Sequence, residues 1–581
     1  MYRPDLSPVA DSLALSALVG ALPLLTLFVL LGGLRLKAHW AGLAALGTSV
    51  VVAVWAYGMP VDLALLAGTE GAAFGLFPIM WIVLAALWVH QLTVTSGRFA
   101  DLRGAFNLVS GDPRVQALII AFCFGALLEA LAGFGAPVAI TGVMLTALGF
   151  SPVRAAVTVL VANTAPVAFG AIATPIITAG SLTGIAPEDI GAYVGRQTPL
   201  LALFVPLLLV ALVDGVRGIR QTWPVALVCG GAFAVAQFVS ANYLSVELTD
   251  IIAALVALAA VVGFLRVWQP GDGERVREDL RRAAGRERLE QRETDDDTAR
   301  AGTPGDGTSG GDTARGGATS IRATAGAAGA APLTGSRIVL AFVPYLVVIT
   351  VFAVAKLWEP AKEFLAGSDV TVRWPGLDGE VLTAAGKPSS TTAYVFPWLS
   401  SPGSLLLLCG LLVAAAHRVR PVDAVREFGR TVLTLRWALL TVGSVLALAY
   451  VMNLSGQTIT IGTWIAGAGA AFAFLSPLLG WLGTAVTGSD TSANALFATL
   501  QQTAAGKAGL DPTLLVAANT SGGVVGKMIS PQNLTIAATA VGLLGKEAVL
   551  FRKAVAWSLL LLLAICLLVL LQSHALSWML P

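Results

Sequence analysis

The chain has 581 residues, of which 56% are hydrophobic and 12% charged, and its formal net charge is only +2. Soluble proteins carry about 25% charged residues, and no soluble core can bury so much apolar surface under so little polar covering. The mean hydropathy of +0.80 therefore excludes a soluble enzyme. Because the apolar runs are continuous rather than alternating, they also exclude a transmembrane β-barrel and indicate an all-α polytopic membrane protein.

Helices that cross a membrane need about 20 predominantly apolar residues. In chain order, the clear candidates have apolar cores at Leu13–Gly33, Trp40–Tyr57, Phe77–Gln91, Leu200–Val213, Val225–Val239, Ile251–Leu265, Ile338–Val354, Ser404–Ala416, Ala438–Val451, Thr463–Leu479 and Ala554–Leu571. Two further stretches, residues 117–190 and 484–544, are apolar but interrupted by Gly, Pro, Asn and charged residues. Counting both, we expect about 12–14 membrane segments.

The gaps between these runs predict the orientation, because cytoplasmic loops are enriched in Lys and Arg. Basic residues cluster at positions 35–37, 98–114, 217–220, 269–336, 417–436 and 546–553. If all of these clusters lie inside the cell, cytoplasmic and outer loops alternate along the chain as the clear spans require. Between Glu359 and Lys387 there are three basic and five acidic residues, which fits an extracytoplasmic loop at residues 359–397. Both termini are then expected outside.

The charge distribution divides the chain into three expected parts. Membrane halves at residues 1–266 and 337–581 flank a cytoplasmic linker at residues 267–336, and 22 of the chain's 70 charged residues lie between Gln269 and Ser336. Within the linker, residues 301–330 are almost wholly Gly, Ala, Thr, Asp, Ser and Arg, a composition that cannot build a packed core. Its 10 Arg are balanced by 12 acidic residues, which argues against nucleic-acid binding.

One motif occurs twice, once in each membrane half. The segment Ala162–Pro175 aligns without gaps on Ala518–Pro531, sharing Ala-Asn-Thr, then Gly six residues after Thr, then Pro five residues after that Gly. An Xaa-Pro turn precedes each copy, and an interrupted apolar element with one acid precedes each turn. Paired Gly/Pro interruptions in two halves of a membrane protein point to a transporter's binding site. We therefore expect an inverted repeat with two broken-helix or re-entrant hairpin elements, and sites within residues 117–190 and 484–544.

The polar residues of the repeat are candidates for substrate binding. Backbone freed at a helix break attracts anions, and adjacent Asn and hydroxyl side chains can bind a polar substrate. The candidates are Asn163, Thr164, Asn519, Thr520 and Ser521. The alternative is that the two asparagines only cap broken helices.

Charged residues at membrane depth are costly and mark functional sites. Glu129 lies in an apolar stretch before a Gly-Phe-Gly break, and burial favours the neutral form of a carboxylic acid, so it is our first candidate for carrying a proton. The second is Asp490, which could equally be a cation ligand or a helix cap. Lys527 could pair with a substrate carboxylate, neutralise Asp490 or reach the interface.

Motifs of other functions are absent from the sequence. No His/Cys/Asp cluster has metal-ligand spacing, no Walker-type loop occurs, and no Ser/His/Asp set is evident. The sequence therefore predicts neither an enzyme nor a protein with a bound cofactor, and a proton is the coupling ion that we expect. A channel and an intramembrane enzyme are less favoured alternatives.

Four segments resemble the L-lactate permease family closely. They are residues 127–140, 162–170, 480–483 with 487–492, and 516–523 with 526–532, and the likeness extends from the first span to the C-terminus. The resemblance implies a proton-coupled importer of L-lactate and related short 2-hydroxy monocarboxylates (D-lactate, glycolate) in the bacterial inner membrane. In that case Phe134 and Gly135 would shape the apolar side of the site for the substrate's methyl group.

The paired Asn-Thr motifs are also similar, more distantly, to Ser-Asn-Thr motifs of sodium-coupled dicarboxylate transporters. That likeness implies an elevator-like transport domain moving against a scaffold, usually in a homodimer, and it keeps sodium coupling as the alternative. Ala162 and Ala518 replace the first Ser, which weakens the transfer of sodium sites. Proton coupling also fits the energetics, since a monovalent anion entering the cell works against about 2.3 kcal/mol per 100 mV of membrane potential.

Overall fold

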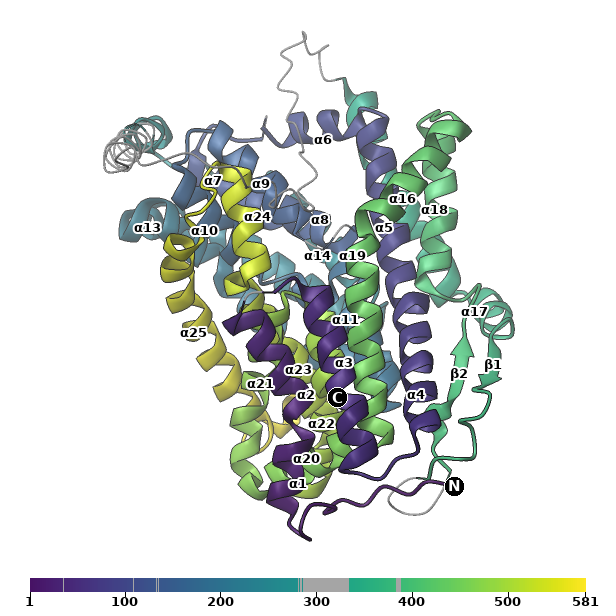
Figure 1. Cartoon of the computed structure of the whole chain (residues 1–581). Helices are drawn as coiled ribbons and strands as arrows, with labels where there is room; N and C mark the ends of the chain where they lie inside the picture. The colour runs from purple at the N-terminus through teal and green to yellow at the C-terminus, as the bar shows by residue number, and fades with distance from the viewer. Residues whose placement is uncertain are drawn as a thin grey trace, which may run out of the picture.

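The computed structural model describes residues 1–34, 36–107, 109–131, 133, 135–280, 282, 285, 334–382 and 388–581. Within them the chain is nearly all helix, with one two-stranded antiparallel sheet, β1 (Val370–Arg373) and β2 (Ala393–Phe396). In this part of the chain nine helices are long and apolar enough to cross a membrane, or ten if one bent pair counts as a span, and three shorter apolar helices accompany them. The expected all-α membrane architecture is confirmed (Figure 1).

The first helices pack around one long helix of the second half. They are α1 (Leu13–Gly20), α2 (Leu22–Phe28) with a π-turn to Gly33, α3 (Ala38–Trp55), α4 (Val61–Phe74), a π-turn (Gly75–Met80) and α5 (Trp81–Thr95). Helix α19 (Pro421–Leu454) packs against α3, α4 and α5. Small residues permit this contact: a Cβ on Gly71 would lie 2.6 Å from the Leu446 carbonyl oxygen.

The region expected to hold the first site begins with a hairpin. Its first arm comprises α7 (Pro113–Ala117), a π-turn (Leu118–Phe124) and α8 (Gly125–Leu131). Its second arm is α9 (Ala136–Ala147). Gly133 and Gly135 at the tip have φ of +47° and +83°, which only glycine adopts readily. Next come α10 (Pro152–Ala162) and α11 (Gly170–Thr183), which are bent by 63° across a short break.

The second site region repeats this order. Helices α21 (Phe472–Thr487) and α22 (Asp490–Ala508) form a hairpin that turns at Gly488, where φ is +79°. Helix α23 (Pro512–Gly526) follows, then a 3-10 turn (Lys527–Ile529) and α24 (Pro531–Val541). Both expected interrupted elements are therefore present.

The two regions are inverted relative to each other. Helix α24 packs against α9, whereas α11 packs against α22, so each hairpin contacts the distal half of the other region's broken helix. Figure 1 shows α9 and α24 toward one end of the molecule, and α22, the counterpart of α9, toward the other. This arrangement agrees with the expected inverted repeat.

The remaining helices connect and enclose these elements. They are α6 (Arg98–Asn107), α12 (Pro187–Val194), α13 (Thr198–Tyr243), α14 (Thr249–Phe264), α16 (Gly335–Leu357), α17 (Glu359–Ala366), α18 (Pro402–Ala416) and α25 (Glu547–Gln572). Non-helical backbone at Asp214 and Gly215 divides α13 into two passes. Gly469, with φ +57°, likewise breaks the chain between α20 (Gln457–Ile465) and α21, inside the expected run Thr463–Leu479.

The N-terminus and the loop expected outside the cell lie together. Tyr2 forms a β-bridge with Val381, and the Met1 amino group lies 3.2 Å from Glu380. Strands β1 and β2 belong to the same loop, near the N-terminus in Figure 1. The contact agrees with the expectation that the N-terminus and residues 359–397 share one side of the membrane.

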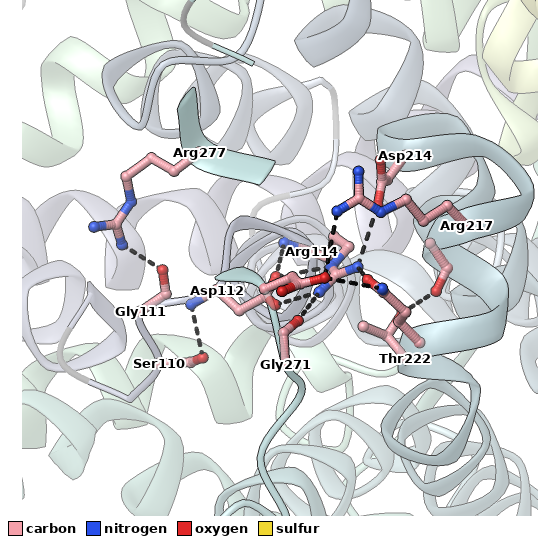
Figure 2. Close-up of polar contacts among 12 residues, drawn as sticks. Ser110, Gly111, Asp112, Arg114, Asp214, Arg217, Thr222, Gly271 and Arg277 are labelled. Carbon is pink, nitrogen blue, oxygen red and sulfur yellow. Dashed lines mark hydrogen bonds and ion pairs between the residues drawn. The ribbon is translucent and has the colours of Figure 1, made fainter. Parts of the chain in front are cut away.

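A buried arginine fixes the base of the first hairpin (Figure 2). Arg114 is fully buried, and its guanidinium lies 2.7 Å from the Asp112 carboxylate and 3.1 Å from that of Asp214, at the break in α13. It also donates to the Gly271 carbonyl oxygen at 2.9 Å. This one side chain therefore joins the hairpin, the α13 break and the first residues of the expected linker. The linker itself, residues 267–336, lies largely outside the described residues and stays a prediction.

Candidate functional site

An ion pair buried between the two halves forms the centre of the candidate site. Glu129, in the last turn of α8, accepts a hydrogen bond from Lys527 Nζ at 2.5 Å, although the two residues are 398 positions apart. Both side chains are buried, with exposed fractions of 2% and 7%. Among the described residues, none donates a hydrogen bond to the second oxygen, Glu129 Oε2. The first expected proton carrier thus pairs with the lysine, a pairing not considered from the sequence.

Glycine makes room for this pair. A Cβ on Gly170, at the start of α11, would lie 3.0 Å from Glu129 Oε1 and 3.1 Å from its Cγ. The three residues after it, Ala171, Ile172 and Ala173, have φ between 45° and 56°, a left-handed conformation that is unfavourable for residues with a Cβ. Such strained backbone concentrates at functional sites, where the surrounding packing maintains it.

Eight residues surround a small, closed gap on one side of Lys527, and we call this gap the pocket. Its polar lining consists of Asn163, Thr164, Asn533 and Lys527, and its apolar lining of Val138, Leu160, Val524 and Met528. The Thr164 hydroxyl donates to the Val161 carbonyl oxygen at 2.7 Å. Among the described groups, Asn163 Oδ1 is buried without a hydrogen-bond partner. One cation, one unsatisfied polar atom and an apolar wall therefore border the same space.

Asn533 belongs to this pocket and was missed in the sequence. Its Nδ2 donates to the Lys527 carbonyl oxygen at 2.9 Å, and the Ser530 hydroxyl donates to the same oxygen at 3.0 Å. These two bonds satisfy backbone freed at the helix break. The usable signal was the Ser-Pro pair after the break, because Pro531 at a helix start places Asn533 on its first turn.

The second Ala-Asn-Thr copy lies elsewhere, inside α23. Asn494 Oδ1 accepts from Asn519 Nδ2 and from the Thr520 hydroxyl, both at 3.0 Å. Gln501 Nε2 donates to Asn519 Oδ1 at 3.2 Å, and the Ser521 hydroxyl donates to Gln197 Oε1 at 2.6 Å. These buried bonds tie α23 to α22 and to Gln197, the residue before α13, and none of the three candidates lines the pocket.

Asp490 begins α22 beside the second hairpin tip. It is 3% exposed, and its Oδ1 accepts from the Thr484 hydroxyl at 3.3 Å. Gly523 allows the approach of α23, since a Cβ there would lie within bonding distance of Asp490 Oδ1, at 1.9 Å. Asp490 Oδ2 is buried without a partner among the described residues, and the carboxylate interacts electrostatically with Lys527.

The other two candidates concern the first hairpin tip. Phe134 lies outside the described residues. Gly135 packs against α24, because a Cβ on it would lie 2.3 Å from Ile536 Cδ1 and 3.5 Å from Asn533 Oδ1. Within the described chain, no group of three or more His, Cys, Asp or Glu side chains is placed to hold a metal ion.

Comparison with known proteins identifies the family. The family described as L-lactate permease matches residues 16–576. The chain is 41% identical to the glycolate permease GlcA of Escherichia coli K12, over 100% of this chain and 99% of that protein. It is 40% identical to the L-lactate permeases of Bacillus subtilis 168 (99% of each chain) and of Escherichia coli K12 (100% of each chain).

These relatives are named as permeases rather than enzymes, and they are bacterial. Together with the helices long enough to cross a bilayer, they identify a multi-pass bacterial membrane protein. The match covers both halves and both hairpins. The chain belongs to the L-lactate permease family.

Proposed function

We propose that the protein imports L-lactate, D-lactate and glycolate across the bacterial inner membrane together with a proton. The observation that carries this proposal is the buried Glu129–Lys527 pair, which borders a pocket of neutral polar groups. A small anionic substrate needs a cation, hydroxyl-binding groups and space for at most one methyl group. The residues lining the pocket supply the cation and the hydroxyl-binding groups, and permeases 40% and 41% identical to the chain are named for lactate and glycolate.

Lys527 is the group that would bind the substrate carboxylate. It is the cation of the pocket lining, and a charge-assisted hydrogen bond from an ammonium group is about twice as strong as a neutral one. The 2-hydroxyl would bond to Asn163, whose Oδ1 is buried without a partner among the described residues, and to Asn533. The methyl of lactate would contact Val138 and Leu160, and glycolate would leave that space empty.

Glu129 would couple the substrate to the proton. While it is ionised it holds Lys527 in an ion pair, and removing either partner's charge leaves the other buried and uncompensated. Protonation of Glu129 frees Lys527 for the substrate carboxylate, so proton and anion bind together. One proton and one monovalent anion then cross as a neutral pair. Asp490, buried and electrostatically linked to Lys527, is the second candidate for the proton.

The inverted hairpins fit an elevator-like movement in a homodimer, which forms part of the same proposal. Glu129 lies just before one hairpin tip and Asp490 just after the other, so both tips border the region around Lys527. Helices α3, α4 and α5 pack on α19 and would form the scaffold. Cross-linking of single cysteines in α19 across two copies would test the dimer.

The test is uptake of labelled lactate into proteoliposomes under separate proton and sodium gradients. An inward proton gradient alone should drive accumulation, and the Glu129→Gln variant should lose accumulation while retaining lactate–lactate exchange. Stimulation by sodium alone, or accumulation by Glu129→Gln against a gradient, would overturn proton coupling through Glu129. Flux that only follows voltage would indicate a channel instead.

A further inference from the structure

A third buried carboxylate lies close to the site and was not singled out from the sequence. Asp250 is in the first turn of α14 and is 1% exposed. Its Oδ1 accepts from Gln237 Nε2 at 3.2 Å, and its Oδ2 is buried with no partner among the described residues. A buried acid with one unsatisfied oxygen is costly, so it indicates a role beyond packing.

The same amide links Asp250 to the first helix break. Gln237 Nε2 also donates to the carbonyl oxygen of Ala165 at 3.3 Å, two residues after Asn163. The Thr198 hydroxyl lies 3.4 Å from Gln237 Oε1 and 3.1 Å from the Val194 carbonyl oxygen, and it can donate its one proton to either. Asp250 is therefore held in position relative to the backbone that forms the pocket.

The charges facing Asp250 are those of the central pair. Helix α14 packs against α8, α13 and the π-turn 118–124. Within the described structure, the charged groups that act on Asp250 are Glu129 of α8 and Lys527. Helix α13 faces it with the neutral Gln237, and the titratable group of the π-turn, Cys123, contacts Cys229 of α13 at 3.6 Å.

Asp250 lies toward the outer side of this pair. The short connection between α13 and α14 precedes it, and there Glu247 pairs with Lys356 at 2.6 Å, next to the start of the extracytoplasmic loop. Glu247 differs from Asp250 in having its charge compensated. Burial tends to raise the pKa of Glu247, but Lys356 and the Ser245 hydroxyl outweigh this and hold its pKa below the ordinary value. Glu247 is therefore held in its ionised form by its partners.

We infer that Asp250 is a proton-relay residue between the extracytoplasmic side and Glu129. The inference rests on the proposed proton symport. A proton arriving from outside binds a carboxylate oxygen of Asp250, and that O–H bond breaks as a bridging water passes a proton to Glu129. Asp250 returns to the carboxylate, Glu129 becomes neutral, and Lys527 is released for substrate. Charge and atoms balance, since one proton moves between two carboxylates.

Loss of the relay should slow proton-coupled uptake without changing how many protons accompany each lactate. A variant of Asp250 should therefore lower the rate of uptake but not the final lactate gradient. In proteoliposomes, Asp250→Asn should lower the initial rate of lactate uptake driven by a pH gradient by ~100-fold, the lower end of the range for a positioned proton-transfer group. Lactate–lactate exchange, in which the loaded site keeps its proton, should stay near wild type. The lactate gradient reached at equilibrium should also equal that of wild type. Glu247→Gln is the matched control, a buried acid at the same end of α14 whose loss should leave the uptake rate unchanged.

Each outcome decides between the models. Wild-type uptake rates in Asp250→Asn would overturn the relay, and so would equal loss of uptake and exchange, which indicates a structural role. Asp250→Ser, a smaller side chain that leaves room for water, gives the same readouts if the amide variant does not fold. If wild-type protein shows no proton-driven uptake, the symport itself fails, and the result is distinct from failure of the relay.

Discussion

The two copies of the Ala-Asn-Thr repeat show how one motif can serve two purposes. In the first copy, α10 ends at Ala162, so Asn163 and Thr164 lie at the break and line the pocket. In the second copy, α23 continues to Gly526, and the side chains of Asn519 and Thr520 are bonded to Asn494. The first copy thus presents polar atoms to a ligand, and the second connects helices.

A single residue explains the difference. Position 166 is proline and the aligned position 522 is glycine. Proline lacks the N–H that continues a helix and ends α10, whereas Gly522 allows α23 to continue. The second break comes later, at Lys527, whose aligned residue in the first copy is Ala171. The halves are therefore complementary: the first contributes Glu129, Asn163 and Thr164, and the second contributes Lys527 and Asn533.

Of the changes that test this complementarity, replacing Lys527 should have the largest effect on transport and stability. Lys527→Met leaves Glu129 buried and unpaired, so we expect transport to be abolished and the free energy of unfolding to fall by about 3–5 kcal/mol. Thermal unfolding in detergent and lactate uptake measure the two effects. The exposed Lys507→Met is the control, and the double variant Glu129→Gln/Lys527→Met should recover most of the stability but no uptake. A single variant as stable as wild type would contradict the pairing.

Breaking the second-copy network should cost stability rather than affinity. Asn519→Ala removes the donor to Asn494 and the acceptor of Gln501, and each buried group left unsatisfied costs about 1–3 kcal/mol. The KM for lactate should change less than about twofold, since Asn519 does not line the pocket. A large rise in KM with unchanged stability would place the second copy in the binding site after all.

A side chain at Gly522 tests the close packing of α23 against α21. A Cβ on Gly522 would lie 2.1 Å from the Pro477 carbonyl oxygen, so Gly522→Ala should destabilise the protein by about 1–3 kcal/mol. Gly506→Ala in α22 is the matched control: nothing lies within 4 Å of its Cβ position, and alanine should stabilise that helix by up to about 1 kcal/mol. Equal melting temperatures for the two variants would disprove the contact.

The first copy should show the opposite pattern, with the smallest effect on stability. Asn163 Oδ1 has no partner among the described residues, so Asn163→Ala should change the free energy of unfolding by less than about 1 kcal/mol. Its KM for lactate should rise about 10-fold, as for loss of one polar substrate contact. Propionate, which lacks the 2-hydroxyl, should inhibit this variant and wild type equally. A selective loss of propionate inhibition would assign Asn163 to the carboxylate.

Sequence reasoning located the elements better than their partners. The sequence showed that both apolar stretches are interrupted, and in the structure Gly133 and Gly488 lie at the hairpin tips, because turns with positive φ favour glycine. The Glu129–Lys527 pair could not be predicted, because the two residues are 398 positions apart and only the fold brings them together. The different environments of Asn163 and Asn519 could have been predicted from the sequence, because Pro166 ends α10 whereas Gly522 allows α23 to continue.

Asp250 was missed for a similar reason. It lies one residue before the apolar run Ile251–Leu265 and resembled a loop residue, although helix α14 already starts at Thr249. Its burial comes from the packing of α13 and α8, which residue spacing within α14 does not encode. A neighbouring Gln237 inside an apolar helix was the available signal.

The buried Arg114 has a consequence for engineering. It fixes Gly271 to α7, while Arg337, at the start of α16, lies 2.6 Å from Asp101 of α6. The chain is therefore anchored on both sides of residues 286–333 by contacts that do not involve them. Each doubling of a loop's length costs only about 0.6 kcal/mol, so a fluorescent reporter domain placed between these anchors should leave the two membrane halves in register and make the transporter visible in living cells.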